Sequence, residues 1–207
     1  MKMKKAILLS FLFVMAMSHS VYGQVKLDIS TGINISNAEF KNSDLFSFPT
    51  DSRTGFFVGV SPSFPLNEKV NLIVDFQFSQ KGFDDLDYSY LDIIPEIEFK
   101  VLPFLKLGVG LNYGIKVINE FRGVNINGMA VDFDFIDSTD FGLTGKIKAN
   151  YKKWFVFLRY NYGLKNILAE DFTDENGDPI EGIKLINKNF QIGVGYTFGL
   201  KKNMIEL

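Results

Sequence analysis

The chain has 207 residues, with 22 basic and 24 acidic side chains, one histidine and no cysteine. The lack of cysteine excludes disulfides, thiol chemistry and a lipid-modified amino-terminal cysteine. The slight excess of acidic residues does not suit nucleic acid, which binds to basic surfaces, so we expect no nucleic-acid partner.

The first 23 residues are typical of a secretory signal peptide. Three lysines precede an apolar run over residues 6–17, which is shorter than the about 20 residues of a transmembrane helix. We therefore predict a signal peptide over residues 1–23 and a mature domain over residues 24–207. Cleavage would remove these lysines together with His19, and would leave the mature domain without histidine.

Eight segments of the mature chain alternate between apolar and polar residues with a period of two, as the two faces of a β-strand do. The clearest is residues 105–117, LKLGVGLNYGIKV. These segments match the about 9–11 tilted residues with which a strand crosses a bilayer. In chain order the expected strands are residues 25–36, 55–66, 70–81, 90–101, 105–117, 141–151, 154–164 and 189–200.

The connections between these segments alternate between long and short. Outer-membrane barrels show this alternation, with short periplasmic turns, longer external loops and an even number of strands. We therefore predict an all-β fold, an eight-stranded antiparallel up-and-down transmembrane β-barrel in the cell outer membrane, with both termini periplasmic. Long loops are expected over residues 37–54, 82–89, 118–140 and 165–188.

Alternation alone does not say which face of the strands points inward. The main alternative is a lipocalin-like barrel, which carries a small apolar ligand in an apolar interior. The apolar face has aromatic residues at both of its ends, as the interfacial girdles of membrane barrels do, and this favours lipid outside. The expected girdle residues are Phe56, Phe78, Tyr113, Phe141, Tyr162 and Phe190 near the loops, and Phe64, Phe99, Tyr151, Trp154 and Phe198 near the turns.

Two prolines, Pro62 and Pro95, lie inside predicted strands. Proline has no N–H to donate to a neighbouring strand. We expect a β-bulge or an early end to strand pairing at each of them.

The polar face carries charges of both signs, and we expect these charges to meet inside the barrel. An eight-stranded barrel is just wide enough for its own side chains, and buried charges must be paired. This predicts a salt-bridged lumen, although a gated ion path or a proton relay is an alternative for the same residues. The expected network comprises Asp75, Asp92, Glu96, Glu98, Lys106, Lys116, Lys146, Lys148 and Arg159.

The mature chain lacks the histidine that hydrolytic triads and many metal sites require, so we expect no enzymatic activity, no cofactor and no metal. Residues 171–178, DFTDENGD, have the wrong spacing for a calcium loop, and the glycines at 108 and 110 lie within a strand rather than in a dinucleotide loop. The phenylalanine-rich residues 40–48 and 121–135 would form a binding surface, a lid or a short strand extension.

Several stretches together resemble the PorT-like outer-membrane β-barrel family of Gram-negative bacteria. They are SQKG at 79–82, YLDIIP at 90–95, YNYGL at 160–164 followed by Asn166 and Ile167, and FQIGVGYTF at 190–198. Two departures from the family are the acidic Glu96 and Glu98 after the proline, and the continuation of the chain beyond Phe198.

The resemblance implies an outer-membrane barrel and, for one branch of the family, a part in protein secretion. The final strand resembles the one that the barrel-assembly machinery recognises. The expected partners are outer-membrane lipid, this machinery during insertion, and a protein partner at the external loops. The expected role is that of a non-enzymatic barrel whose loops bind or form surface structure, with a secretion or assembly component and an apolar-ligand carrier as alternatives.

Overall fold

The computed structural model describes residues 25–41, 51–83, 86–121, 124–126, 129–131, 136–168 and 184–199. The predicted signal peptide and the acidic segment 171–178 lie outside these residues. No helix in these ranges is long and apolar enough to cross a membrane. The strands are β1 Lys26–Lys41, β2 Arg53–Pro65, β3 Val70–Phe83, β4 Leu86–Lys100, β5 Leu105–Phe121, β6 Val124–Ile126, β7 Met129–Val131, β8 Thr139–Tyr151, β9 Trp154–Gly163 and β10 Lys184–Gly199.

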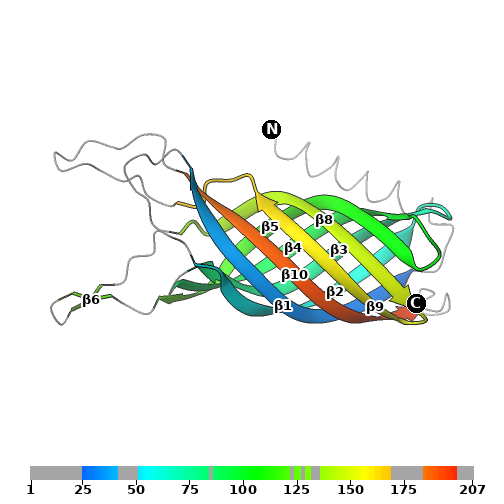
Figure 1. The fold of residues 1–207 in the computed structure, drawn as a ribbon, viewed down its shortest axis with the longest axis horizontal. Coiled ribbons are helices and arrows are strands. Elements are labelled where there is room, and N and C mark those ends of the chain that lie inside the picture. Colours follow the sequence, from blue (N-terminus) through cyan, green and yellow to red (C-terminus); the bar gives the residue numbers. More distant parts are fainter. Residues whose placement is uncertain are drawn as a thin grey trace, which may run out of the picture.

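Eight of these strands close into an antiparallel barrel with the order β1-β10-β9-β8-β5-β4-β3-β2 (Figure 1). Lys26 pairs with Gly199, so the first and last barrel strands close the sheet. The short turns 66–69, 101–104 and 152–153 lie at one end of the barrel, which we name the turn end, and the opposite end is the loop end. This arrangement confirms the predicted eight-stranded antiparallel up-and-down barrel.

Apolar side chains cover the outside of the barrel. Ile33, Val109 and Val156 are 52%, 57% and 56% exposed, whereas the inward Asn34 and Arg159 are at most 2% exposed. The period-two pattern therefore places its apolar face outward, as a barrel in lipid requires. The inner wall is largely polar and charged, which excludes the apolar interior of a lipocalin-like barrel.

Aromatic rings lie near both rims of this apolar surface. At the turn end Tyr196 packs edge-on against both Trp154 and Phe198, with centroid distances of 5.1 and 4.7 Å. Nearer the loop end the rings of Phe56 and Phe78 lie 6.0 Å apart. Aromatic rings at these two levels are typical of the interfaces between a membrane and water.

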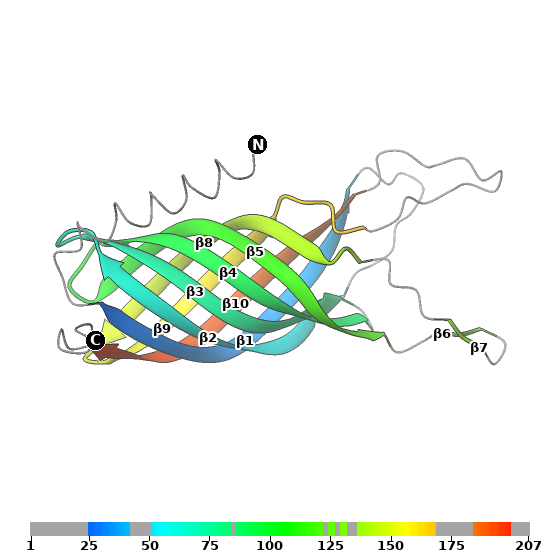
Figure 2. The same ribbon diagram turned by 180° about the vertical axis from the view of Figure 1, so that it is seen from behind.

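The strands extend further towards the loop end than the sequence predicted. β3 and β4 pair as far as Phe83 and Leu86, so the predicted loop 82–89 is largely strand. β5 runs to Phe121, and β6 and β7 form a two-stranded hairpin within residues 121–135 (Figure 2). The binding surface and the lid stay predictions for this segment, and residues 42–48 of the other phenylalanine-rich segment lie outside the described residues.

An apolar cluster inside the loop end explains this extension. Rings of Phe83, Tyr88 and Tyr90 pack edge-on, with successive centroids 6.2 and 5.8 Å apart. Because apolar residues turn inward here, the alternation that marks the lipid-spanning part is lost. The cluster, named below the loop-end apolar cluster, comprises Ala38, Phe83, Tyr88, Tyr90, Ile136, Ile167 and Leu185.

The two prolines interrupt strand pairing without shifting it. The β2–β3 ladder stops after Val60 and resumes at Ser63 with the same register, so Pro62 lies in a two-residue gap. The β4–β5 ladder has the same kind of gap between Ile93 and Glu96, around Pro95. Pairing resumes beyond each proline, and the bulge in β4–β5 pairing lies elsewhere, at Ser89 and Tyr90.

Candidate functional site

The middle of the lumen is occupied by a buried arginine. Arg159 projects from β9, where its Cα pairs with that of Lys146 on β8 and with that of Gln191 on β10. Its Nη2 donates to Oδ2 of Asp75 at 2.7 Å, and its Nε donates to Oε1 of Glu96 at 3.1 Å. The guanidinium thus bridges strands on opposite sides of the barrel.

Neutral and charged neighbours complete this group. Nη1 of Arg159 donates to Oε1 of Gln77 at 3.0 Å and to Oε1 of Gln191 at 3.2 Å. Lys146 forms an ion pair with the second oxygen of Glu96. Both carboxylates and the guanidinium are at most 2% exposed, so each charge is compensated by a partner out of water. The Arg159 cluster comprises Asp75, Gln77, Glu96, Lys146, Arg159 and Gln191.

A second group of charges lies towards the turn end. Lys148 pairs with Asp28, and its Nζ lies 3.9 Å from Oε2 of Glu98. Lys106 donates to Oε1 of Glu98 at 2.6 Å. These pairs join β1, β4, β5 and β8.

A third group lies between the Arg159 cluster and the loop-end apolar cluster. Lys81 donates to Oδ1 of Asp92 at 2.9 Å, and Ser79 donates to the other oxygen of the same carboxylate at 2.5 Å. Oδ2 of Asp140 lies 3.9 Å from the Lys81 ammonium and accepts a hydrogen bond from Asn187 at 3.0 Å.

Eight of the nine expected network residues take part in these three groups. Lys116 lies nearer the loop end, where its ammonium donates to the carbonyl oxygen of Ile136 at 2.5 Å. Three residues of these groups, Asp28, Lys81 and Asp140, are not in the expected network. For Lys81 a signal was present, because the period of two places every second residue from Asn71 onward inside β3.

Phenylalanine rings fill one side of the lumen beside these charges. Phe57, Phe155 and Phe157 are at most 4% exposed, and the rings of Phe57 and Phe157 lie 5.7 Å apart. They pack where β10 has glycine: a Cβ built on Gly193 would lie 2.5 Å from the Phe157 ring. The lack of a side chain at this position of β10 therefore leaves room for the phenylalanine rings of β2 and β9.

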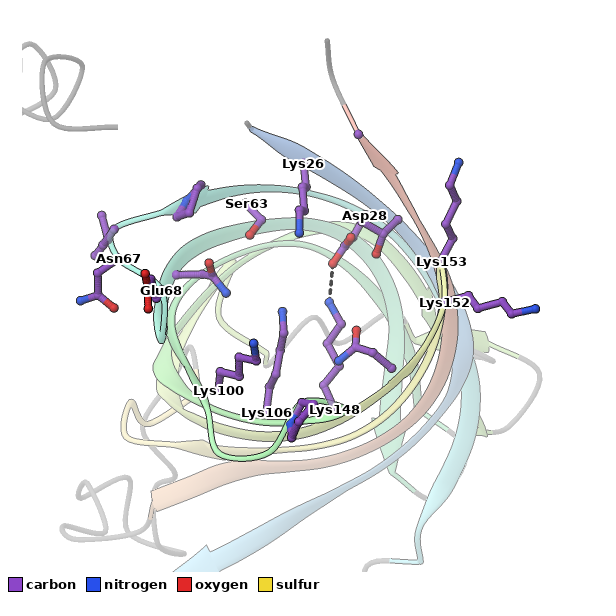
Figure 3. A pocket seen from close by; sticks show the side chains of 17 residues that line it. Lys26, Asp28, Ser63, Asn67, Glu68, Lys100, Lys106, Lys148, Lys152 and Lys153 are labelled. Atoms are coloured by element: carbon purple, nitrogen blue, oxygen red, sulfur yellow. Dashed lines mark hydrogen bonds and ion pairs between the residues drawn. The ribbon is translucent and has the colours of Figure 1, made fainter. Parts of the chain in front are cut away.

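A cavity of about 940 Å³ opens at the turn end of the barrel. Lys26, Lys100 and Lys106 project into it from β1, β4 and β5 (Figure 3). The Lys148–Asp28 pair lies at its inner side. Beyond that pair, the space next to the Arg159 cluster is about 10 Å³, near the lower limit for one water molecule.

At the loop end an ion pair fixes the entry into β8. Asp137 accepts the backbone N–H of Thr139 at 2.9 Å and pairs with Lys165 at 2.8 Å. The hydrogen bond from the Lys165 ammonium lowers the pKa of the Asp137 carboxyl from its ordinary value of 3.8. Within the described ranges no three residues of the types His, Cys, Asp and Glu gather as a metal site.

The fold, the apolar belt and the polar lumen define a class of protein, the small β-barrels of outer membranes. The sequence matches the family described as "Outer membrane protein beta-barrel domain" over residues 18–169, and the chain belongs to this family. Its family and its apolar outer surface support a location in the outer membrane. No curated protein sequence matches the chain significantly.

Solved structures of other bacterial proteins are similar to this barrel. The attachment invasion locus protein Ail of Yersinia pestis, crystallised with the heparin analogue sucrose octasulfate, is 16% identical with a TM-score of 0.50, and the alignment covers 85% of this chain and 100% of Ail. The outer membrane protein OprG of Pseudomonas aeruginosa is 15% identical with a TM-score of 0.44, over 86% of this chain and 97% of OprG. At these identities the likeness concerns the fold alone.

Proposed function

We propose that this protein is a non-enzymatic integral barrel of the outer membrane, closed across its lumen by ion pairs, which makes its external contacts through the loop end. The observation that carries this proposal is the Arg159 cluster, where a guanidinium from one wall binds carboxylates from the opposite walls. A barrel of eight strands has little interior space, and this cluster takes up its middle.

An ion can pass through the lumen only if it breaks the buried ion pairs of the Arg159 cluster. A permeating ion would have to separate Arg159 from both Asp75 and Glu96, leaving buried charges without partners, which costs several kcal/mol. The lumen carboxylates in the described ranges are engaged by cations, hydroxyls or amides, which supports a structural rather than a catalytic role for them.

Recording in planar bilayers tests the closed lumen. The purified protein is expected to give no steady conductance, whereas the double variant Glu96→Ala, Arg159→Ala is expected to conduct, because it removes the centre of the cluster. A matched variant, Lys188→Ala, removes a cation whose pair with Glu39 is partly exposed. This variant should give no steady conductance. A large steady conductance of the unmodified protein would overturn the proposal.

We place the turn end and both termini in the periplasm and the loop end outside the cell, as short turns and longer loops in outer-membrane barrels suggest. The chain has no cysteine, so labelling of a single introduced cysteine shows on which side of the outer membrane that residue lies. An impermeant maleimide on intact cells should label Ser138→Cys at the loop end and spare Asn67→Cys at the turn end until the outer membrane is opened. The reverse pattern would invert the orientation.

The proposal includes membership of the PorT-like family, supported by YLDIIP in β4 and FQIGVGYTF in β10. It also includes three kinds of partner: outer-membrane lipid around the apolar belt, the barrel-assembly machinery during insertion, and a protein at the external loops. The extension of β1, β4, β5 and β10 at the loop end supports the last. Co-purification in mild detergent tests it, since a stoichiometric protein partner would favour a secretion or assembly component over a barrel acting alone.

A further inference from the structure

The turn-end cavity contains more positive than negative charge. Six lysines line it. The side chains of Lys152 and Lys153 extend away from the opening (Figure 3), which leaves four ammonium groups to consider, those of Lys26, Lys100, Lys106 and Lys148. Lys148 is paired with Asp28, and Lys106 is paired with Glu98. The other two ammonium groups, at the open side, have no acidic partner in the part of the chain that the structure describes.

The two lysines without an acidic partner stand on different walls. Lys26 begins β1 and Lys100 ends β4, three strands apart in the barrel order. Figure 3 shows both side chains directed into the opening. Glu68 in the β2–β3 turn also borders the cavity, but it forms no ion pair with either lysine. Convergent cations without counter-charges attract anions from solution.

The size of the cavity suits a small molecule rather than a single ion. Its volume of about 940 Å³ lies within the range of ligand pockets, about 300–1,000 Å³. Side-chain amides of Asn71 and Asn150 and the hydroxyl of Ser63 line the same walls and can donate hydrogen bonds to oxyanions.

We propose that the turn-end cavity binds a small solute with two or more phosphate or carboxylate groups, held between Lys26 and Lys100 with Lys106 beneath them. The site does not depend on closure of the lumen. The orientation proposed above would make the periplasm the source of the ligand.

Two further lysines at the same end provide a matched control. Lys152 and Lys153 extend away from the opening in Figure 3. Their ammonium groups lie 5.5 Å from the Tyr151 ring and 5.9 Å from the Tyr196 ring, and both rings belong to the outward face. Replacing them removes the same charge from the same end without changing the inward-directed cations.

Titration calorimetry of the folded full-length mature protein in detergent tests the proposal, with tripolyphosphate, citrate and an uncharged trisaccharide as probes. We expect at least one of the two anions to bind, binding to weaken with ionic strength, and the trisaccharide to give no heat. Lys26→Gln with Lys100→Gln should weaken binding about tenfold or more, because two charge-assisted contacts are lost. Lys152→Gln with Lys153→Gln should leave binding within about twofold, since these two side chains extend away from the opening and their charge is screened by salt.

The relative affinities of the two anions show whether phosphate or carboxylate is preferred. Absence of binding by both anions, or equal loss in the two double variants, would overturn the proposal. Amine acylation followed by mass spectrometry gives a second measurement on the unmodified chain, where the bound anion should protect Lys26 and Lys100 but not Lys153. Binding without that protection would also contradict the site. The bilayer recordings are independent of these results, so a failure here leaves the closed lumen untouched.

Discussion

Arg159 and Asp75 belong to strands on diametrically opposite sides of the barrel, yet Nη2 of the arginine lies 2.7 Å from Oδ2 of the aspartate. β9 and β3 are four positions apart in a ring of eight, so this bond crosses the full width of the lumen. Ser61 donates to the other aspartate oxygen at 2.8 Å and thereby orients the carboxylate. The lumen is therefore spanned by one ion pair with a hydrogen-bonded support.

Removing the guanidinium should destabilise the barrel strongly. Arg159→Met leaves Asp75 and Glu96 buried with fewer partners, and breaking such a pair on one side costs about 3–5 kcal/mol. Urea unfolding in lipid vesicles, followed by the fluorescence of the only tryptophan, Trp154, measures this loss.

A compensated variant separates lost charge pairing from lost packing. In the triple variant Asp75→Asn, Glu96→Gln, Arg159→Met the carboxylates are neutral, so part of the lost free energy of unfolding should return. If the triple variant is no more stable than Arg159→Met alone, burial of uncompensated charge is not the cause.

The period of two in the sequence was sufficient to predict which way each lipid-spanning strand faces. It places Ile33 on the outside and Asn34 on the inside. In that part of the barrel the outer face contacts lipid and the inner face contacts charged side chains. Nearer the loop end the rule fails, since Phe83 and Tyr88 turn inward and the outer surface no longer has to be apolar. Residues 82–83 and 86–89 therefore gave the pattern of a loop while forming paired strands.

Which charges meet could not be predicted from the alternation. Lys148 pairs with Asp28, 120 residues away along the chain. The choice of partner depends on the tilt and stagger of the strands, which set the heights of side chains on distant walls. The alternation placed Asp75 and Arg159 inside the barrel, but it did not indicate the bridge from β8 to β1.

Adding a methyl group at Gly193 should destabilise the lumen. Its Cβ would lie 2.5 Å from Cε1 of Phe157 and 2.7 Å from Cζ of Phe57, and these rings are confined by one another. Overpacking of this kind costs about 1–3 kcal/mol. Unfolding of Gly193→Ala should show this loss, and Phe157→Leu in the same chain should recover part of it.

Gly145 is the matched control for that substitution. It faces outward on β8, and a Cβ there would meet nothing within 4 Å. Gly145→Ala should change the free energy of unfolding by less than about 0.5 kcal/mol, as is usual for surface substitutions. An equal loss of stability at both glycines would show that contact with the phenylalanine rings is not the cause of the loss at Gly193.

A charge on the outer face should be costly at mid-height and tolerated at the rim. Leu158 is 44% exposed on the outside, next along the chain to Arg159. Arginine near the bilayer midplane costs about 2–4 kcal/mol, and near the interface about 0–1. Leu158→Arg should therefore lower stability in vesicles far more than Leu102→Arg in the β4–β5 turn, and equal effects would contradict the lipid-facing assignment.

The Asp137–Lys165 pair should make the loop end slightly acid-sensitive. The lowered pKa of Asp137 means that its ionised form is favoured in the folded state. Its contribution is thus fully present above the ordinary value of 3.8, and it is lost as the pH falls through the lower folded pKa. The pair is partly exposed, so the contribution is modest.

Comparing the unmodified protein with Asp137→Asn isolates this contribution, because all other acids titrate equally in both. The difference in their free energy of unfolding should be constant near neutral pH and should shrink as the pH falls well below the ordinary value for aspartate. Lys165→Gln should behave in the same direction, since it removes the ammonium that lowers the Asp137 pKa. The asparagine side chain can still accept the hydrogen bond from Thr139, so a difference that does not change with pH would show that the charge of the Asp137 carboxylate is not its cause.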